Sequence, residues 1–324
     1  MALAVGTLGT WSGEGVRVGR IVEALADLRH GEQRMATRTS VVNLVIVAAT
    51  ETEATRAAEA THRMAGRHPG RTITLICDRT SDGPIDAVVS LHEASAGDQR
   101  VWWEDVTLQV RGDVVDHLNT LVEPLTIADL PVAVWFVGRP VGARDRLLES
   151  ADAVLVDTKE AGGPGAFGFV GDLATRHTVV DLSWVRLAPW RQLLAGLFEG
   201  REYRPFVHGV RQATVTGKSG PRQLLAGWLA SRLSLPRNQF HQDESRHASM
   251  RLVAEHDGQE AIFVVERDEG ERVVRASASV TGGPHHEDVL TLPDDSLPWS
   301  LAAALTHLAP DRVYQAALRV AGAF

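Results

Sequence analysis

The first two thirds of the chain alternate between apolar runs and amphipathic stretches. TSVVNLVIVAAT at residues 39–50 is a nearly continuous β-branched run, and TITLICD at 72–78 is a second one. The stretch between them has helix-forming composition and stops before a Pro-Gly pair at 69–70. This order predicts a strand, a helix and a parallel strand joined by a right-handed crossover.

The same alternation continues to about residue 181. Helices are expected at 114–125 and 144–151, and the glycine-rich segment 159–172 is expected to be a surface loop. Further strands are expected at residues 86–92, 100–112, 130–138, 151–157 and 177–181. Strands that alternate with helices predict a three-layer α/β domain with a mostly parallel sheet.

The periodicity changes in the last third of the chain. Segments 207–217, 248–258, 260–268 and 271–280 alternate apolar and polar residues with a period of two. This pattern predicts a smaller α+β domain built on an antiparallel sheet. We place the boundary near residue 204, which gives an α/β domain at 1–204 and an α+β domain at 205–324.

The hexapeptide RQLLAG occurs twice, at 191–196 and 222–227. Pro189 and Pro221 precede the copies at positions that suit a first helical turn, and apolar residues follow at helical spacing. The flanking sequences do not align, and a repeat array needs three or more units. We therefore interpret the copies as two separate amphipathic helices whose apolar sides face the core.

Composition narrows the class of protein. The chain of 324 residues is 44% hydrophobic and 23% charged, as in a globular protein, and its formal charge of −8 argues against nucleic acid as the main partner. Cys77 is the only cysteine, which excludes an intrachain disulfide and a multi-cysteine metal site. No apolar run of about 18 residues and no signal-peptide pattern occur, so we expect a cytoplasmic protein with no membrane partner.

Gly217-Lys218-Ser219 is a candidate anion site, because it lies between a predicted strand and the start of a helix. A full phosphate loop requires glycine where this chain has Gln212. We favour an ordinary strand-to-helix turn, with a weak anion-binding role for Gly217, Lys218 and Ser219.

Other polar positions also have a structural interpretation. Asp157 and Asp181 each end an apolar strand, where ligands often bind, although carboxylates there also cap helices or pair with arginine. The run HHED at 285–288 suggests a metal, but after TGGP we favour an exposed turn and expect no metal. The motifs HExxH and GxSxG are absent, and no GxGxxG directly follows a predicted strand, so we assign no catalytic residue and no cofactor.

The segment DLSWVRLAPWR at 181–191 carries two tryptophans and two arginines. Tryptophan in apolar elements usually packs in a core, but tryptophan with arginine is also typical of interface hot spots. The candidate partner-binding residues are therefore Trp184, Arg186, Trp190 and Arg191.

Five blocks in order resemble the OpcA family of glucose-6-phosphate dehydrogenase assembly proteins. They are TRTSVVNLVIVAATETEATRAAEATHRMAGRHPGRTITLICD, LPVAVWFVGRP, ADAVLVDT, DLSWVRLAPWRQLLAGLF and LLAGWLASRL. The resemblance runs from about residue 37 to residue 233 and is strongest at 181–198.

The resemblance implies a non-catalytic activator that binds glucose-6-phosphate dehydrogenase, favours its active oligomer and supports NADPH supply through the oxidative pentose phosphate pathway. Family members in photosynthetic bacteria can carry cysteines through which thioredoxin adjusts the activation. Cys77 is the only cysteine of this chain, which argues against such redox control, and the composition resembles that of the actinobacterial branch. The alternative is an enzyme or sensor that binds a sugar phosphate or nucleotide at Lys218 and the strand-end edge. The sequence leaves open whether the chain forms a homo-oligomer.

Overall fold

The computed structural model of the protein describes residues 4–30, 40–64, 70–96, 99–138, 146–161, 165–268 and 272–324. The chain divides into two compact units. Unit 1 comprises Met1–Asp157, Arg176–Val180 and Ser296–Ala309, and unit 2 comprises Thr158–Thr175, Asp181–Asp295 and Pro310–Phe324. The expected boundary near residue 204 falls inside unit 2, because the helices that precede it pack with the second sheet. That residues 1–204 and 205–324 fold as separate domains stays a prediction.

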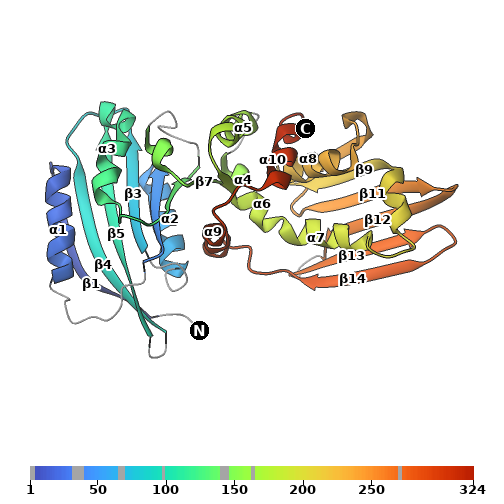
Figure 1. Ribbon diagram of the computed structural model, residues 1–324, viewed down its shortest axis with the longest axis horizontal. Coiled ribbons are helices and arrows are strands. Elements are labelled where there is room, and N and C mark those ends of the chain that lie inside the picture. Colours follow the sequence, from blue (N-terminus) through green and yellow to red (C-terminus); the bar gives the residue numbers. More distant parts are fainter. Residues whose placement is uncertain are drawn as a thin grey trace. The chain divides into compact units, whose positions relative to one another are not determined.

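Unit 1 is built on an eight-stranded sheet, of which β1, β3, β4, β5 and β7 are labelled in Figure 1. Its order is β1-β4-β5-β3-β2-β6-β7-β8. The strands are β1 (Ala4–Gly13), β2 (Val42–Ala48), β3 (Gly70–Asp78), β4 (Asp86–Ala96), β5 (Gln99–Arg111), β6 (Val132–Phe136), β7 (Ala153–Val156) and β8 (Val179–Asp181). The run from β5 through β3, β2 and β6 to β7 pairs in parallel, whereas β1, β4 and β5 pair antiparallel. The predicted mostly parallel sheet is confirmed.

Helices cover both faces of this sheet. The helical elements of unit 1 are α1 (Val18–His30), α2 (Glu51–Met64), η1 (Gly112–Asp116), α3 (Leu118–Val122), η2 (Glu123–Leu125), η3 (Arg146–Ser150) and α9 (Leu297–Thr306). On β5, Glu104 meets Arg29 of α1, while its neighbour Asp105 meets His62 of α2. Adjacent strand residues point to opposite faces, so α1 and α2 lie on opposite faces and the predicted three layers are confirmed.

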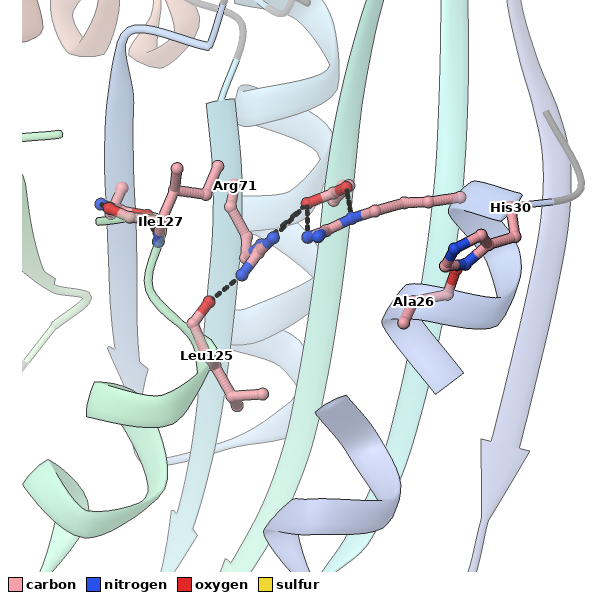
Figure 2. Close-up of polar contacts among 8 residues, drawn as sticks. Ala26, His30, Arg71, Leu125 and Ile127 are labelled. Atoms are coloured by element: carbon pink, nitrogen blue, oxygen red, sulfur yellow. Dashed lines mark hydrogen bonds and ion pairs between the residues drawn. The ribbon is translucent and has the colours of Figure 1, made fainter. Parts of the chain in front are cut away.

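A buried ionic network fixes α1 to the sheet (Figure 2). Arg29 Nε and Nη2 donate to the two carboxylate oxygens of Glu104 at 2.6 and 3.0 Å. Arg71 Nε donates to Glu104 Oε2 at 2.8 Å, and Arg71 Nη1 donates to the carbonyl of Leu125 in η2. Arg71 and Glu104 are both buried. One carboxylate thus joins two guanidinium groups from α1 and β3.

Unit 2 is built on a six-stranded sheet of order β10-β9-β11-β12-β13-β14. Its strands are β9 (Val210–Gly217), β10 (Phe240–Glu244), β11 (Ser249–His256), β12 (Gln259–Arg267), β13 (Val273–Val280) and β14 (His285–Thr291). Only the edge pair β10–β9 is parallel, so the predicted antiparallel sheet is confirmed. Its helical elements are α4 (Thr158–Ala161), α5 (Ala166–Arg176), α6 (Leu182–Arg186), α7 (Ala188–Leu197), η4 (Arg204–Gly209), α8 (Pro221–Leu233), η5 (Arg237–Gln239) and α10 (Arg312–Ala321).

The two RQLLAG copies form α7 and α8, and each helix has proline in its first turn, as expected. Leu194 and Leu197 of α7 and Leu224 and Leu225 of α8 are buried, so the apolar sides face the core as predicted. In α8, a Cβ at Gly227 would lie 2.4 Å from the Ala317 carbonyl oxygen of α10. Glycine therefore permits the close approach of these two helices.

The prediction of a surface loop at 159–172 is wrong for the described residues. Residues 158–161 form α4 and 166–176 form α5, while 162–164 lie outside the described residues. Phe167, Val170 and Leu173 of α5 are buried, and a Cβ at Gly168 or Gly171 would have open space around it. The buried apolar side stabilises a helix that the glycines alone would disfavour.

Candidate partner-binding site

Trp184 and Arg191, two of the predicted partner-binding residues, contact each other within unit 2. Arg191 Cζ lies 3.4 Å from the centroid of the Trp184 ring, a cation–π contact, and Arg191 Nη1 donates to the Trp184 carbonyl at 2.8 Å. Burial lowers the pKa of Arg191 to about 10, and the carboxylates of Asp311 and Asp181 act in the opposite direction. The pair joins α6 to α7.

Asp181 organises the start of α6. Its Oδ1 accepts hydrogen bonds from Ser183 N at 2.9 Å and Thr158 N at 3.2 Å, and its Oδ2 accepts one from the Tyr314 hydroxyl at 3.3 Å. Trp184 Nε1 donates to Asp311 Oδ2 at 2.8 Å. Asp311 in turn caps α10. The expected capping role of Asp181 is confirmed, and one buried network holds α4, α6 and α10 together.

The remaining predicted residues differ in exposure. Trp190 is buried, and its Nε1 donates to the Ala248 carbonyl at 3.2 Å. Arg186, in the last turn of α6, is half-buried. Both arginines are half-buried, whereas both tryptophans are buried. Direct partner binding by Trp184, Arg186, Trp190 and Arg191 stays a prediction.

An apolar groove of about 230 Å³ lies between the C-terminal halves of α7 and α8. Its lining residues are Leu194, Ala195, Phe198, Val207, Trp228, Leu229, Arg232, Leu233 and Leu252. Ala195 and Arg232 are exposed, and Phe198 and Leu233 are half-buried. Arg232 is the one charged residue in this lining. The groove thus offers an apolar floor with a cationic rim, which suits an apolar anchor from another protein.

The Gly217-Lys218-Ser219 segment forms the expected strand-to-helix turn between β9 and α8. Lys218 and Ser219 are exposed, and Gly217 is buried with a φ of 142°. Gln223 Oε1 accepts from Gly220 N at 3.0 Å and from Ser219 Oγ at 3.1 Å. A side chain of the helix itself therefore occupies one backbone donor, and anion binding here stays a prediction.

The structure revises the run HHED. Residues 285–288 are exposed, but they begin strand β14 rather than form a turn, because they pair in register with β13. His286 Nε2 lies 2.9 Å from Asp288 Oδ2 on the same face of the strand.

The single cysteine, Cys77, is buried in β3. Neither feature adds a reactive group to the groove.

One cluster was missed from the sequence. His62, His92 and Asp105 come from α2, β4 and β5, and their ligand atoms lie within 4.8 Å of one another. Strand alternation could place His92 and Asp105 on one face, but nothing in the sequence pattern brings His62 of α2 over them.

These features define a two-unit α/β protein with an apolar groove lined by residues of α7 and α8. Family models described as the N-terminal and C-terminal domains of a glucose-6-phosphate dehydrogenase subunit match residues 61–168 and 177–318. The chain belongs to the OpcA family of glucose-6-phosphate dehydrogenase assembly proteins.

Curated relatives carry the name "Putative OxPP cycle protein OpcA". The protein from Synechocystis is 28% identical over 181 residues, which is 52% of this chain and 38% of the relative. The protein from Synechococcus elongatus is 30% identical over 189 residues, or 55% and 42%. The matched region thus spans less than half the length of these relatives.

A solved structure titled as an oxidoreductase from Sinorhizobium meliloti aligns with 87% of both chains at a TM-score of 0.36 and 10% identity, which is too distant to support a conclusion. Within the described residues, no helix is long and apolar enough to cross a membrane.

Proposed function

We propose that this chain binds glucose-6-phosphate dehydrogenase and favours its active oligomer in the oxidative pentose phosphate pathway. The observation that supports the proposal is the pair of matches to models of a glucose-6-phosphate dehydrogenase subunit, which together extend from residue 61 to residue 318. The role is non-catalytic: the chain acts on the oligomeric state of the dehydrogenase and so raises NADPH supply. We place it in the cytoplasm, in the actinobacterial branch, without a nucleic-acid or membrane partner.

The physical mechanism is a shift between two populations of the dehydrogenase. A protein that binds the active oligomer more tightly than the inactive form stabilises it by the difference in binding free energy. A 100-fold difference in affinity corresponds to about 2.7 kcal/mol. A few well-buried side-chain contacts supply a free energy of this size.

We place the principal contact at the groove between α7 and α8. Trp184, Trp190 and Arg191 hold α7 from the inside through the hydrogen bonds and ring contact described above. In this arrangement they position the groove, while the exposed Arg232 at its rim is the charged group that side chains of the dehydrogenase contact.

The test uses the full chain and the dehydrogenase of the same organism, with light scattering after size exclusion for the oligomer and NADPH formation for activity. Ala195→Phe fills the groove from an exposed helix position, and Gln192→Phe adds the same ring at an exposed position of α7 outside the groove lining. We expect Ala195→Phe to weaken binding at least about tenfold, or about 1.4 kcal/mol, and Gln192→Phe to bind as the unmodified chain does.

The two parts of the proposal can fail separately. If the unmodified chain neither binds the dehydrogenase nor changes its activity, the function is wrong. If it binds and activates but Ala195→Phe does so equally well, the function stands and the groove is not the contact. Binding and activation by Trp184→Ala and Arg186→Ala variants that remain folded then show whether the predicted segment at 181–191 makes the contact.

A further inference from the structure

Three potential metal ligands converge on the face of the unit 1 sheet that α2 covers. His62 Nε2 lies 2.6 Å and His92 Nε2 lies 3.2 Å from the same oxygen, Asp105 Oδ2. His62 belongs to the last turn of α2, whereas His92 and Asp105 belong to the paired strands β4 and β5. Among the described residues, these three side chains form the one group of at least three histidine, cysteine, aspartate or glutamate residues that can hold a metal ion.

The surroundings of the cluster fix its ligands. Thr7 Oγ1 lies 3.2 Å from His92 Nδ1, so the ring is held from behind while Nε2 points at Asp105. The buried Trp103 stacks on the His92 ring, with 5.3 Å between centroids and 19° between planes. A hydrogen bond to the second ring nitrogen and an apolar wall are the usual outer surroundings of a metal-binding histidine.

The two carboxylate oxygens of Asp105 differ in their hydrogen bonding. Oδ2 receives both imidazoles, whereas the buried Oδ1 has no hydrogen-bond partner among the described residues. An unpaired buried carboxylate oxygen costs free energy, because it has lost its hydration without gaining a donor. A cation bound at Oδ2 and the two imidazoles would offset the negative charge that the carboxylate shares between its two oxygens.

We propose that His62, His92 and Asp105 bind a zinc ion. Two imidazole nitrogens and one carboxylate oxygen are a common zinc ligand set. Tetrahedral ligands at 2.0–2.1 Å from zinc lie about 3.3 Å apart, close to the 3.2 Å between His92 Nε2 and Asp105 Oδ2. The His62 ring must move outward by less than about 1 Å, and its side chain, 35% exposed, has room to do so.

The bound ion would join the last turn of α2 to β4 and β5, and the exposed side at His62 leaves its fourth position open to water. The proposal concerns unit 1 alone and does not depend on the proposed function. The competing interpretation is a metal-free hydrogen-bonded cluster, in which the imidazoles donate to Asp105. The two interpretations differ in zinc stoichiometry and in the response to loss of His62.

The experiment measures zinc on the full chain without an affinity tag. The protein is stripped with chelator, dialysed against zinc at about pH 8, where free imidazole is neutral, and analysed by mass spectrometry of the metal. Co²⁺ replaces zinc in a parallel sample and reports tetrahedral nitrogen and oxygen ligation by its visible absorption. The variants are His62→Ala and Asp105→Asn, and the control is His286→Ala, which removes an exposed histidine from a His–Asp pair in β14.

We expect one zinc per chain in the unmodified protein and in His286→Ala, a tetrahedral cobalt spectrum, and a melting temperature that rises with zinc. His62→Ala should lose at least about tenfold in zinc affinity, because a ligand is missing. His62 is partly exposed, so this variant is expected to fold even if Asp105→Asn does not. Equal zinc binding by the unmodified chain and His62→Ala, or no zinc bound by either, overturns the proposal.

Discussion

The guanidinium group of Arg191 lies over the indole ring of Trp184, with 3.4 Å between Arg191 Cζ and the ring centroid. Because the same arginine also donates to the Trp184 carbonyl, one side chain connects α7 to both the ring and the backbone of α6. A planar cation can make the two contacts at once, whereas the compact ammonium group of lysine cannot.

Arg191→Lys should therefore destabilise unit 2. We expect a loss of about 1–2 kcal/mol in the free energy of unfolding, because the stacked contact and the directed hydrogen bond are both weakened. Urea unfolding gives the free energy, and amide hydrogen exchange of α6 and α7 localises the effect. Arg201→Lys is the control, since Arg201 is exposed and follows the same helix. Equal stability of the two variants would show that the stacking does not contribute.

Asp181→Ala should cost more than any single contact it makes. The change removes the acceptor of Ser183 N, Thr158 N and the Tyr314 hydroxyl, so it loses a helix cap and leaves buried donors unpaired. We expect about 3 kcal/mol from these effects together. Tyr314→Phe, which removes a donor and leaves the cap intact, should cost only about 1 kcal/mol. Chemical denaturation of both variants gives the ratio of the two losses in the free energy of unfolding. Similar losses would contradict the central role of Asp181.

Asp78, at the end of β3, should titrate well below an ordinary carboxyl. Hydrogen bonds from Ser81 and then Thr80 lower its pKa from 3.8 to about 2. Since the folded pKa is depressed, the stability it contributes is present above 3.8 and is lost as pH falls through about 2. Ser81→Ala removes the strongest of these bonds, so the pKa should rise toward 3.8. Carboxyl-carbon NMR measures it, and an unmodified protein in which Asp78 titrates near 3.8 would refute the assignment.

Most strands were predictable from the sequence because their signals are local, although β1 and β10 were not predicted. The β-branched run of β2 and the period-two pattern of β11 through β13 identify strands without knowledge of their neighbours. Helix α5 was not predictable, since Gly168 and Gly171 disfavour a helix locally and only tertiary burial of Phe167 and Val170 offsets them. Strand β14 was missed for a similar reason. Its exposed residues do not alternate between apolar and polar, and only the pairing with β13 makes the segment a strand.

The sites were less predictable than the sheets. The tryptophans of the 181–191 segment were recognised as important, but the sequence could not distinguish an aromatic anchor for a partner from one that binds Asp311 or Ala248 within the chain. The groove needs the relative placement of α7 and α8, and the metal cluster needs α2 above β4 and β5. Both depend on contacts between segments far apart in sequence, which periodicity does not encode.

The buried network around Glu104 gives the largest expected effect of a single substitution. Arg71 and Glu104 have side chains only 5% exposed, and Arg29 is 36% exposed. Glu104→Gln keeps the shape but leaves two guanidinium groups facing a neutral amide, which should cost about 3–5 kcal/mol. The pair Arg79–Asp116 offers a matched control, because its side chains are 46% and 56% exposed. Asp116→Asn should cost less than about 1 kcal/mol, and less still at high salt. Urea unfolding at low and high salt measures both, and Glu104→Gln must prove the costlier at either salt concentration, because burial prevents solvent from compensating the unpaired charge.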